Sequence, residues 1–135
     1  MIEESTEGGL DFLVLRDAIE GKHPEVLIGF YSEDAELRIV NATLPEGPAF
    51  ELKGRSQIER YLRAVCDQQM GCCVEGEPDF GEGSISFGQV CEYPDRARIS
   101  VRTTLEVAEG LIERQTDVVE RARSDDAMGG ERLRL

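Results

Sequence analysis

The sequence predicts an α+β fold, in which N-terminal helices pack on one face of a curved mixed or antiparallel sheet. The first observation is the order of the elements, because helical patterns fill most of the first half and strand patterns fill the second. The second is a long β-hairpin over Asp95–Arg123. A chain of 135 residues with 40% hydrophobic content is long enough to form one compact domain with its own core.

The first arm of the hairpin alternates strictly between apolar and polar residues. One face carries Ala97, Ile99, Val101, Thr103, Leu105 and Val107. A period of two is typical of a strand with one buried and one wet face. A short turn, Ala108–Gly110, then leads into the second arm, Leu111–Arg121.

The second arm alternates less cleanly, and this irregularity is the main functional lead. One face carries Leu111, Glu113, Gln115, Asp117 and Val119; the other carries Ile112, Arg114, Thr116 and Val118. If the first set shares the buried face of the opposite arm, Gln115 and Asp117 point into an apolar interior. Because burying polar groups without partners is costly, these two side chains require a reason.

Three segments are predicted to be helical. Leu10–Glu20 carries a wide apolar stripe and is followed by Gly21. Pro24 suits the first position of a short helix that ends at Phe30. Ser56–Glu59 has the pattern of a capping box, and the helix it starts is expected to continue to Met70.

The remaining strands precede the hairpin. Ala35–Val40 alternates as a strand. Cys72–Phe80 contains Gly76 and Pro78, which predicts an edge or bulged strand. Ser84–Tyr93 alternates regularly and leads into the hairpin.

The domain boundaries follow from where these patterns stop. Residues 1–9 are polar and expected to be disordered, residues 10–123 form a single domain, and residues 124–135 form a flexible tail. Within the domain, Asn41–Ala49 holds Pro45, Gly47 and Pro48 and is expected to be a loop.

Charge and cysteine usage exclude several classes of function. The net charge of −13 argues against nucleic acid or an anionic membrane as a partner. No apolar run reaches membrane-spanning length and no secretory signal is visible, so a cytoplasmic location is expected. Cys66, Cys72, Cys73 and Cys91 match no zinc spacing and His23 is the one histidine. We therefore expect reduced cysteines, no metal and no cofactor.

Three segments resemble the nuclear transport factor 2-like superfamily, which includes SnoaL-type polyketide cyclases and ketosteroid isomerases. Gly21–Ala35 is similar to its helix–YADDA–strand opening, Lys53–Leu62 to its GREAI helix start and Gly110–Asp117 to its closing GxIxxxxD strand. The resemblance covers Leu10 to Arg121. It implies a cone-shaped, cystatin-like α+β barrel that encloses an apolar pocket.

Carried over position by position, the resemblance argues against steroid isomerisation. The isomerases' general-base aspartate falls on Ile39, their oxyanion-hole tyrosine on Val14 and their protonated aspartate near Thr103. Polyketide cyclases and epoxide hydrolases instead place carboxylates on the late strands. Asp117 matches the aspartate of the closing strand, and it is the one role that transfers.

Asp117 therefore has two interpretations. In the first it is a general base whose pKa is raised by burial, with Gln115 orienting a substrate oxygen or water and Thr103 completing the cluster. In the second it pairs with Arg114, Arg102 or a backbone amide and only holds strands together.

The expected ligand pocket combines these residues with the positions implied by the fold. Its predicted ligand-binding residues are Thr103, Tyr31, Tyr61, Ile39, Val14 and Val119. The predicted function is binding of a small apolar or oxygenated organic molecule, with proton transfer of cyclase, isomerase, dehydratase or hydrolase type. The alternative is a non-catalytic ligand-binding or dimerisation module on the same fold.

A homodimer through the outer face of the sheet is also expected. That face is predicted to carry Arg98, Arg102 and Thr104 beside Ile112 and Val118. It is too apolar in part to be left wholly exposed to water.

Overall fold

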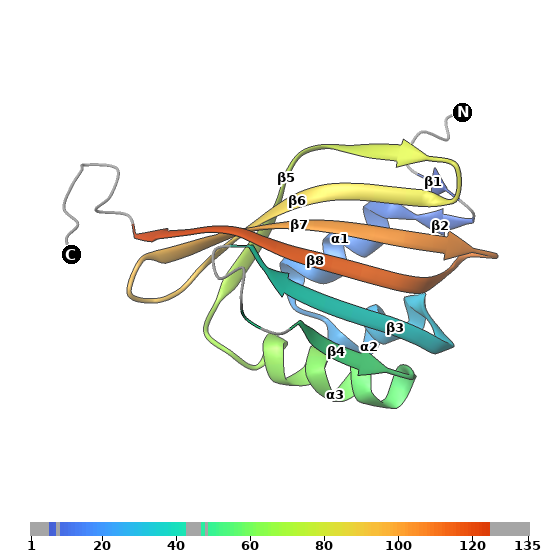
Figure 1. The fold of residues 1–135 in the computed structure, drawn as a ribbon, viewed down its shortest axis with the longest axis horizontal. Helices are drawn as coiled ribbons and strands as arrows, with labels where there is room; N and C mark the ends of the chain where they lie inside the picture. Colours follow the sequence, from blue (N-terminus) through green and yellow to red (C-terminus); the bar gives the residue numbers. More distant parts are fainter. Residues whose placement is uncertain (1–5, 8, 43–46, 48, 125–135) are drawn as a thin grey trace.

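The computed structural model describes residues 6–7, 9–42, 47 and 49–124. Figure 1 shows a curved, open sheet of six strands with helices lying against one of its faces. The strands follow the order β4-β3-β8-β7-β6-β5. Its members are β3 (Tyr31–Asn41), β4 (Phe50–Lys53), β5 (Gly71–Gly81), β6 (Ser84–Glu92), β7 (Ala97–Ala108) and β8 (Leu111–Ser124). The predicted α+β class is confirmed.

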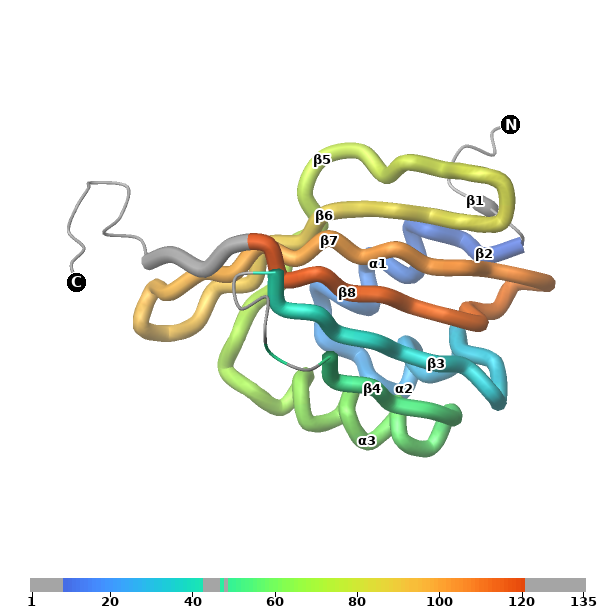
Figure 2. Tube along the Cα trace, in the orientation of Figure 1, coloured from blue at the N-terminus to red at the C-terminus, as the bar shows by residue number. Residues whose placement is uncertain are grey.

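The sheet is mixed, because one of its pairings is parallel. β3 runs parallel to β8, whereas every other pair of neighbouring strands in the sheet is antiparallel. Figure 2 shows the trace of β8 lying between β7 and β3 along the centre of the sheet. This central position gives β8 two neighbours from different parts of the chain. The strand β4, which leads into the third helix, is not foreseen by the sequence patterns.

The β7–β8 hairpin has the expected alternation, interrupted by two register shifts, one of them between Ser100 and Val101. Leu105 lies opposite Gln115 and Thr103 lies opposite Asp117, so both polar residues share the buried face. Near the turn the register shifts between Glu106 and Val107. Because a bulge adds a residue to one strand and changes which side chains face the core, Ile112 turns inward and is 0% exposed. The prediction that Ile112 lies on the outer face is therefore wrong.

The β5–β6 pair is formed as predicted. β5 is an edge strand, and its register with β6 shifts between Glu75 and Asp79, around Gly76 and Pro78. Gly76 has φ of 71°, a conformation that a residue with a side chain adopts only at a cost.

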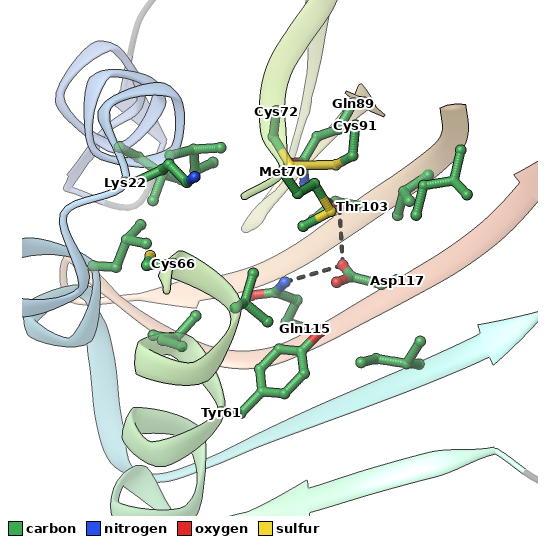
Figure 3. A pocket seen from close by; sticks show the side chains of 18 of the residues that line it. Lys22, Tyr61, Cys66, Met70, Cys72, Gln89, Cys91, Thr103, Gln115 and Asp117 are labelled. Atoms are coloured by element: carbon green, nitrogen blue, oxygen red, sulfur yellow. Dashed lines mark hydrogen bonds between the residues drawn. A yellow bond between two sulfur atoms is a disulfide. The ribbon is translucent and has the colours of Figure 1, made fainter. Parts of the chain in front are cut away.

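The expectation that all four cysteines are reduced is wrong. Cys72 and Cys91 lie directly opposite each other in the β5–β6 register, and they form a disulfide (Figure 3). Cys66 and Cys73 are free. The two bonded positions are 19 residues apart in sequence, so only the strand register shows that they face each other. Disulfides are typical of oxidising compartments, and this one gives no support to the expected cytoplasmic location.

The first helix starts later than predicted. Leu10–Asp11 forms the short strand β2, paired with β1 (Thr6–Glu7), and α1 spans Phe12–Gly21. Asp11 caps α1 by accepting a hydrogen bond from the amide of Leu13 at 3.1 Å. The chain reverses at Lys22, which caps the C-terminus with φ of 59°.

The predictions for the two termini and for the loop after β3 fall partly on residues that the structure does not describe. Thr6–Glu7 was expected to be disordered and instead forms β1. Residues 1–5 and 8, residues 43–46 and 48 of the loop, and residues 125–135 of the tail lie outside what the structure describes. In the described part, no helix has the length and apolar character needed to cross a bilayer.

The other helices correct the predicted boundaries. Pro24 opens α2 (Pro24–Leu27) as expected, and a 3₁₀ turn follows at Ile28–Phe30. The expected capping box is wrong: α3 spans Arg55–Cys66, with Gly54 as its N-cap. The Gly54 amide is held by the carbonyl of Ala35 at 2.8 Å, which ties the start of α3 to β3.

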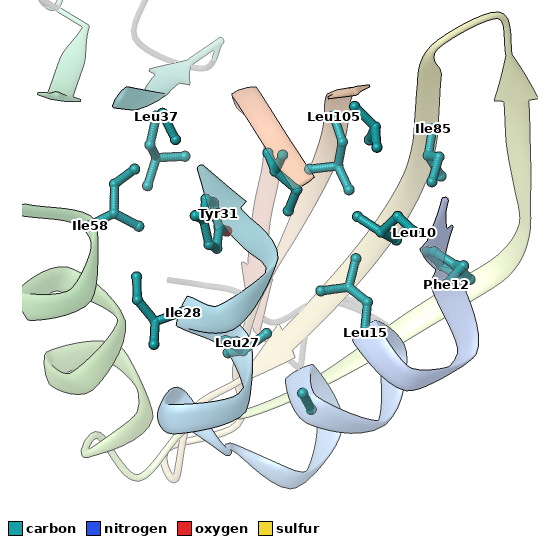
Figure 4. Packing of buried hydrophobic residues seen from close by; sticks show 14 of the residues in the cluster. Leu10, Phe12, Leu15, Leu27, Ile28, Tyr31, Leu37, Ile58, Ile85 and Leu105 are labelled. Carbon is teal, nitrogen blue, oxygen red and sulfur yellow. The ribbon is translucent and has the colours of Figure 1, made fainter. Parts of the chain in front are cut away.

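The core lies between the helices and the concave face of the sheet (Figure 4). Phe12 of α1 packs edge-on against Phe87 of β6 with ring centroids 5.0 Å apart. α1 is also tied to the edge strand, because the Glu20 carboxylate accepts a 2.8 Å hydrogen bond from the amide of Val74. Towards β7 and β8 this layer is not filled by side chains, and the cavity described below remains.

Candidate functional site

A cavity of about 300 Å³ lies between the helices and the concave face of the sheet. This is the lower end of the size range of small-molecule sites. Most of its lining is apolar, from α1, α3 and the central strands. Figure 3 shows polar exceptions, with Asp117 on β8 at one side and Lys22 at the C-terminal end of α1 at the other.

Asp117 sits on the sheet side of the cavity and accepts hydrogen bonds from two neighbouring side chains. Thr103 donates from Oγ1 at 2.9 Å, and Gln115 donates from Nε2 at 3.0 Å. Both donors reach the same oxygen, Oδ1 of Asp117. Thr103 is 1% exposed, so this cluster is closed off from bulk water on the β7 side.

Two further donors extend the cluster into a chain. The Tyr31 hydroxyl donates to Oε1 of Gln115 at 2.5 Å, which fixes the Gln115 amide with its nitrogen towards Asp117. On the other side, Nε2 of Gln89 donates to Oγ1 of Thr103 at 3.0 Å. Every donor in the chain therefore points towards Asp117, an orientation that stabilises its carboxylate form.

The second carboxylate oxygen of Asp117 has a different environment. Oδ2 accepts no hydrogen bond from any residue that the structure describes. The Tyr61 hydroxyl on α3 likewise has no hydrogen bond within the described part of the chain. Figure 3 shows the Tyr61 ring reaching from α3 towards Gln115 and Asp117. On this side of the cavity, Oδ2 of Asp117 is thus an acceptor open to a ligand and the Tyr61 hydroxyl a donor open to it.

Burial governs the electrostatics of this site. Burial raises the pKa of Asp117, and the hydrogen bonds from Gln115 and Thr103 only partly offset this rise. Burial also raises the pKa of Tyr31, helped by the nearby Asp117 charge. For Tyr61, burial and then the Asp117 charge raise the pKa to about 12. Both tyrosines therefore remain protonated donors at neutral pH.

The alternative in which Asp117 is half of an ion pair is contradicted. Arg114 pairs with Glu36 at 3.8 Å and Glu106 at 3.4 Å, and Arg102 pairs with Asp79 at 2.9 Å. No described arginine, lysine or histidine forms an ion pair with Asp117. Among the described residues, its charge is met by neutral donors, and this makes the ionised form costly at a buried position.

Most of the predicted site residues meet in this cavity. Asp117, Gln115, Thr103, Tyr31, Tyr61, Ile39 and Val119 all line it. Ile39 lies beside Asp117 in the parallel β3–β8 register. Val14 does not take part: it is 46% exposed on α1 and outside the lining, because the helix turns Leu15 and Ala18 to the core instead.

The sequence patterns missed four polar residues of the lining, Lys22, Gln68, Gln89 and Tyr93. Gln89 shares the buried face of β6 with Phe87 and Cys91, and this is the same pattern of one polar residue on an apolar face that identified Gln115. Lys22 carries no comparable signal, because it follows the end of a helix and its place depends on tertiary packing. Among the residues described, no group of His, Cys, Asp and Glu has the geometry of a metal site.

Comparison with known proteins gives matches at the level of structure alone. No family model matches the sequence, and no curated protein matches it. A protein named as a candidate ketosteroid isomerase, from Kribbella flavida, superposes with a TM-score of 0.65 at 20% identity, over 91% of this chain and 87% of that one. An NTF2-like protein of unknown function from Mesorhizobium loti gives 0.67 at 18% identity, over 79% and 85%. The chain has the nuclear transport factor 2-like fold.

A third structure with this fold is an LEH-like epoxide hydrolase from M. tuberculosis, with a TM-score of 0.61 and 13% identity over 80% of this chain and 78% of that one. The three names cover different chemistries, and all three identities are low. The nuclear transport factor 2-like fold supplies the cone and its cavity, and the activity has to be argued from the side chains.

Proposed function

We propose that this protein binds a small, largely apolar, oxygenated molecule in its cavity and catalyses proton transfer on it, with Asp117 as the general base. The observation that carries the proposal is the asymmetry of the Asp117 carboxylate. Oδ1 is held by Thr103 and Gln115, whereas Oδ2 accepts nothing from the described residues. A carboxylate that is fixed through one oxygen and open at the other suits a base that meets its substrate within hydrogen-bond reach.

The raised pKa of Asp117 supports this role. A general base is most effective when its pKa approaches the working pH, and burial moves the pKa of Asp117 in that direction. The two hydrogen bonds to Oδ1 limit the rise, and they stabilise the ionised form of Asp117, which is the form that accepts a proton.

The proposed step is the removal of a proton from carbon or oxygen beside a polarised group of the ligand. The proton passes to Oδ2 of Asp117, and negative charge develops on the ligand oxygen. Tyr61 carries a protonated hydroxyl with no partner among the described residues, and it is the donor available to that oxygen. Returning the proton to another atom of the ligand completes an isomerisation or a ring closure, with no change in oxidation state.

A non-catalytic binding module on the same fold is the second candidate. It is favoured by the fact that Asp117 is the single carboxylate among the described lining residues. These residues therefore hold no second carboxyl group that could act as a general acid beside it. In that case the hydrogen-bonded chain from Tyr31 to Gln89 serves only to orient a bound ligand.

Hydrogen–deuterium exchange separates the two candidates without knowledge of the natural reaction. Small ketones and β-keto esters are incubated in D₂O with the protein, and exchange of the hydrogens beside the carbonyl is followed by NMR. We expect the wild-type protein to accelerate the exchange and Asp117→Asn to lose about two to four orders of magnitude of that acceleration. Asp17→Asn, an exposed aspartate on α1 with the same change of charge, is the matched control. Equal rates for Asp117→Asn and wild type would favour the binding module.

We also propose that the chain forms a homodimer. Because Ile112 lies in the core, the dimer proposal rests on Val118 and Thr104. Both side chains are only partly buried within one chain, so a second copy could cover the part that is exposed. Sedimentation at micromolar concentration tests it, and a purely monomeric species would refute it.

A further inference from the structure

We propose that Lys22 binds a carboxylate group, so that the cavity selects molecules with an apolar body and an anionic end. The inference rests on the proposed function in one respect: the other end of such a molecule reaches Asp117. It names the class of substrate, which neither the fold nor the Asp117 cluster specifies.

The first observation is the isolation of the Lys22 charge. Lys22 is the single cation among the described residues that line the cavity, and it is partly buried. Its Nζ donates to a neutral acceptor, the backbone carbonyl of Gln68, at 2.7 Å. It forms no ion pair with any described carboxylate. The nearby Glu25 is 64% exposed, and its carboxylate lies 3.9 Å from Nδ1 of His23.

The second observation is the backbone conformation at Lys22. Its φ of 59° and ψ of 59° lie in the left-handed region, where a residue with a Cβ carries a conformational cost and glycine is favoured. Strain of this kind is a lead to function when the side chain concerned is directed to a site. Here the residue in this conformation carries the one cation among the described residues that line the cavity.

The third observation is the polarity of the cavity along its length. Lys22 lies on the helix side with Gln68 and Cys66, whose side chains are at least partly exposed. Asp117 lies on the sheet side beside Thr103, which is 1% exposed. Figure 3 shows these two groups on opposite sides of the cavity. The cavity is also lined by apolar side chains such as Ile19, Leu62 and Val65.

Size and charge narrow the ligand further. A volume of about 300 Å³ lies at the lower end of the range of small-molecule sites, which fits a medium-chain or aryl carboxylic acid. The chain carries a net charge of −13, so an anion entering the cavity needs a local cation to offset the general repulsion. Lys22 supplies that cation at the more exposed side of the cavity.

The test compares octanoate with octanamide, which has the same size and no charge. Isothermal titration of the wild-type protein is expected to show octanoate binding about tenfold more tightly, in the range of charge-assisted hydrogen bonds at partly exposed sites. Lys22→Met should remove this preference while leaving octanamide affinity unchanged, and Lys22→Arg should keep it. Lys53→Met, which removes an exposed charge outside this cavity, should also keep it.

Two results would overturn the proposal. One is a wild-type protein that binds octanamide as tightly as octanoate. The other is a Lys22→Met variant that loses affinity for both ligands equally and unfolds at a lower temperature, because Lys22 would then only hold the Gln68 carbonyl in place.

The failure of this inference is distinguishable from failure of the proposed function. Octanoate has no reactive group, so its binding to Asp117→Asn should equal that to the wild type even if Asp117 is the base. With 7-oxooctanoate, which has a ketone at the far end, deuterium exchange should be lost in Asp117→Asn and reduced about tenfold in Lys22→Met at low ligand concentration. Loss of the octanoate preference in Lys22→Met with equal exchange in wild type and Asp117→Asn would support the carboxylate site and refute the base.

Discussion

Thr103 and Asp117 lie directly opposite each other on β7 and β8, and the Thr103 hydroxyl donates a 2.9 Å hydrogen bond to Asp117. The pair places a carboxylate on the buried face of the sheet with a neutral partner. The same threonine accepts from Gln89, so its single proton is directed to Asp117. The cross-strand register therefore determines both the position and the hydrogen bonding of the proposed base.

The first prediction concerns the pH dependence of stability. Because the pKa of Asp117 is higher in the folded protein than in the unfolded chain, the folded state binds this proton more tightly. The contribution of Asp117 to the free energy of unfolding therefore falls as pH rises from about 4, the ordinary pKa of aspartate, through the raised value. Asp117→Asn removes this dependence.

Urea unfolding between about pH 4 and pH 8 measures the effect. The stability of Asp117→Asn should increase relative to wild type as pH rises across this range. Asp17→Asn, with the same change of charge on an exposed helix position, should show no such trend. A constant difference between Asp117→Asn and wild type would mean that the Asp117 pKa is not raised.

The second prediction concerns Thr103. Thr103→Val keeps the shape of the side chain and removes one of the hydrogen bonds that lower the pKa of Asp117. The Asp117 pKa should therefore rise further, as followed by the carboxyl carbon in an NMR titration. Thr104→Val is the control, since the Thr104 hydroxyl contacts Ser86 rather than Asp117. An unchanged titration in Thr103→Val would show that this hydrogen bond has no influence on the base.

The third prediction contrasts two tyrosines. Tyr31→Phe breaks the hydrogen bond to Gln115 and leaves a part-buried amide oxygen without its donor, at a cost of about 1–3 kcal/mol in the free energy of unfolding. Tyr61→Phe removes a hydroxyl that has no partner among the described residues, so it should cost little stability. Under the proposed function Tyr61→Phe should nevertheless slow deuterium exchange. If Tyr61→Phe exchanged at the wild-type rate, another group would be the donor to the ligand oxygen.

The sequence predicts the hairpin because alternation is a local property of each strand. The strict period of 96–107 places Val101, Thr103 and Leu105 on the buried face, as the structure shows. The same rule fails at Ile112, because a bulge near the turn shifts which residues face inward. A bulge depends on both strands, so one strand's pattern does not show it.

Site residues were predictable from the sequence where they interrupt the apolar face of a strand. They were not predictable where tertiary packing determines which side chains reach the cavity. Gln115 and Asp117 carry that signal in their own strand. Lys22 reaches the cavity only because α1 ends with a left-handed residue and the segment after α3 supplies the Gln68 carbonyl. The sequence pattern of a capping box at Ser56 does not mark the start of α3. Gly54 is the N-cap instead, because its amide is held by a carbonyl of β3.

The last prediction concerns the disulfide. Cys72 and Cys91 both line the cavity, and their bond joins the edge strand β5 to β6 across 19 residues of sequence. Closing a loop of this length stabilises a protein by about 3 kcal/mol, mainly by restricting the unfolded chain. Replacing both cysteines with alanine should lower the free energy of unfolding by about this amount. Adding a reductant should destabilise the wild-type protein and leave the double variant unchanged.

A variant with Cys66→Ala and Cys73→Ala keeps the disulfide and is the matched control, because these two thiols are free. It should respond to reductant as the wild type does. Mass spectrometry of the protein after alkylation without reductant reports the bond directly, with two labelled thiols expected per chain. Four labelled thiols in freshly prepared protein would restore the expectation of reduced cysteines, and the edge of the cavity would then be held by the β5–β6 hydrogen bonds alone.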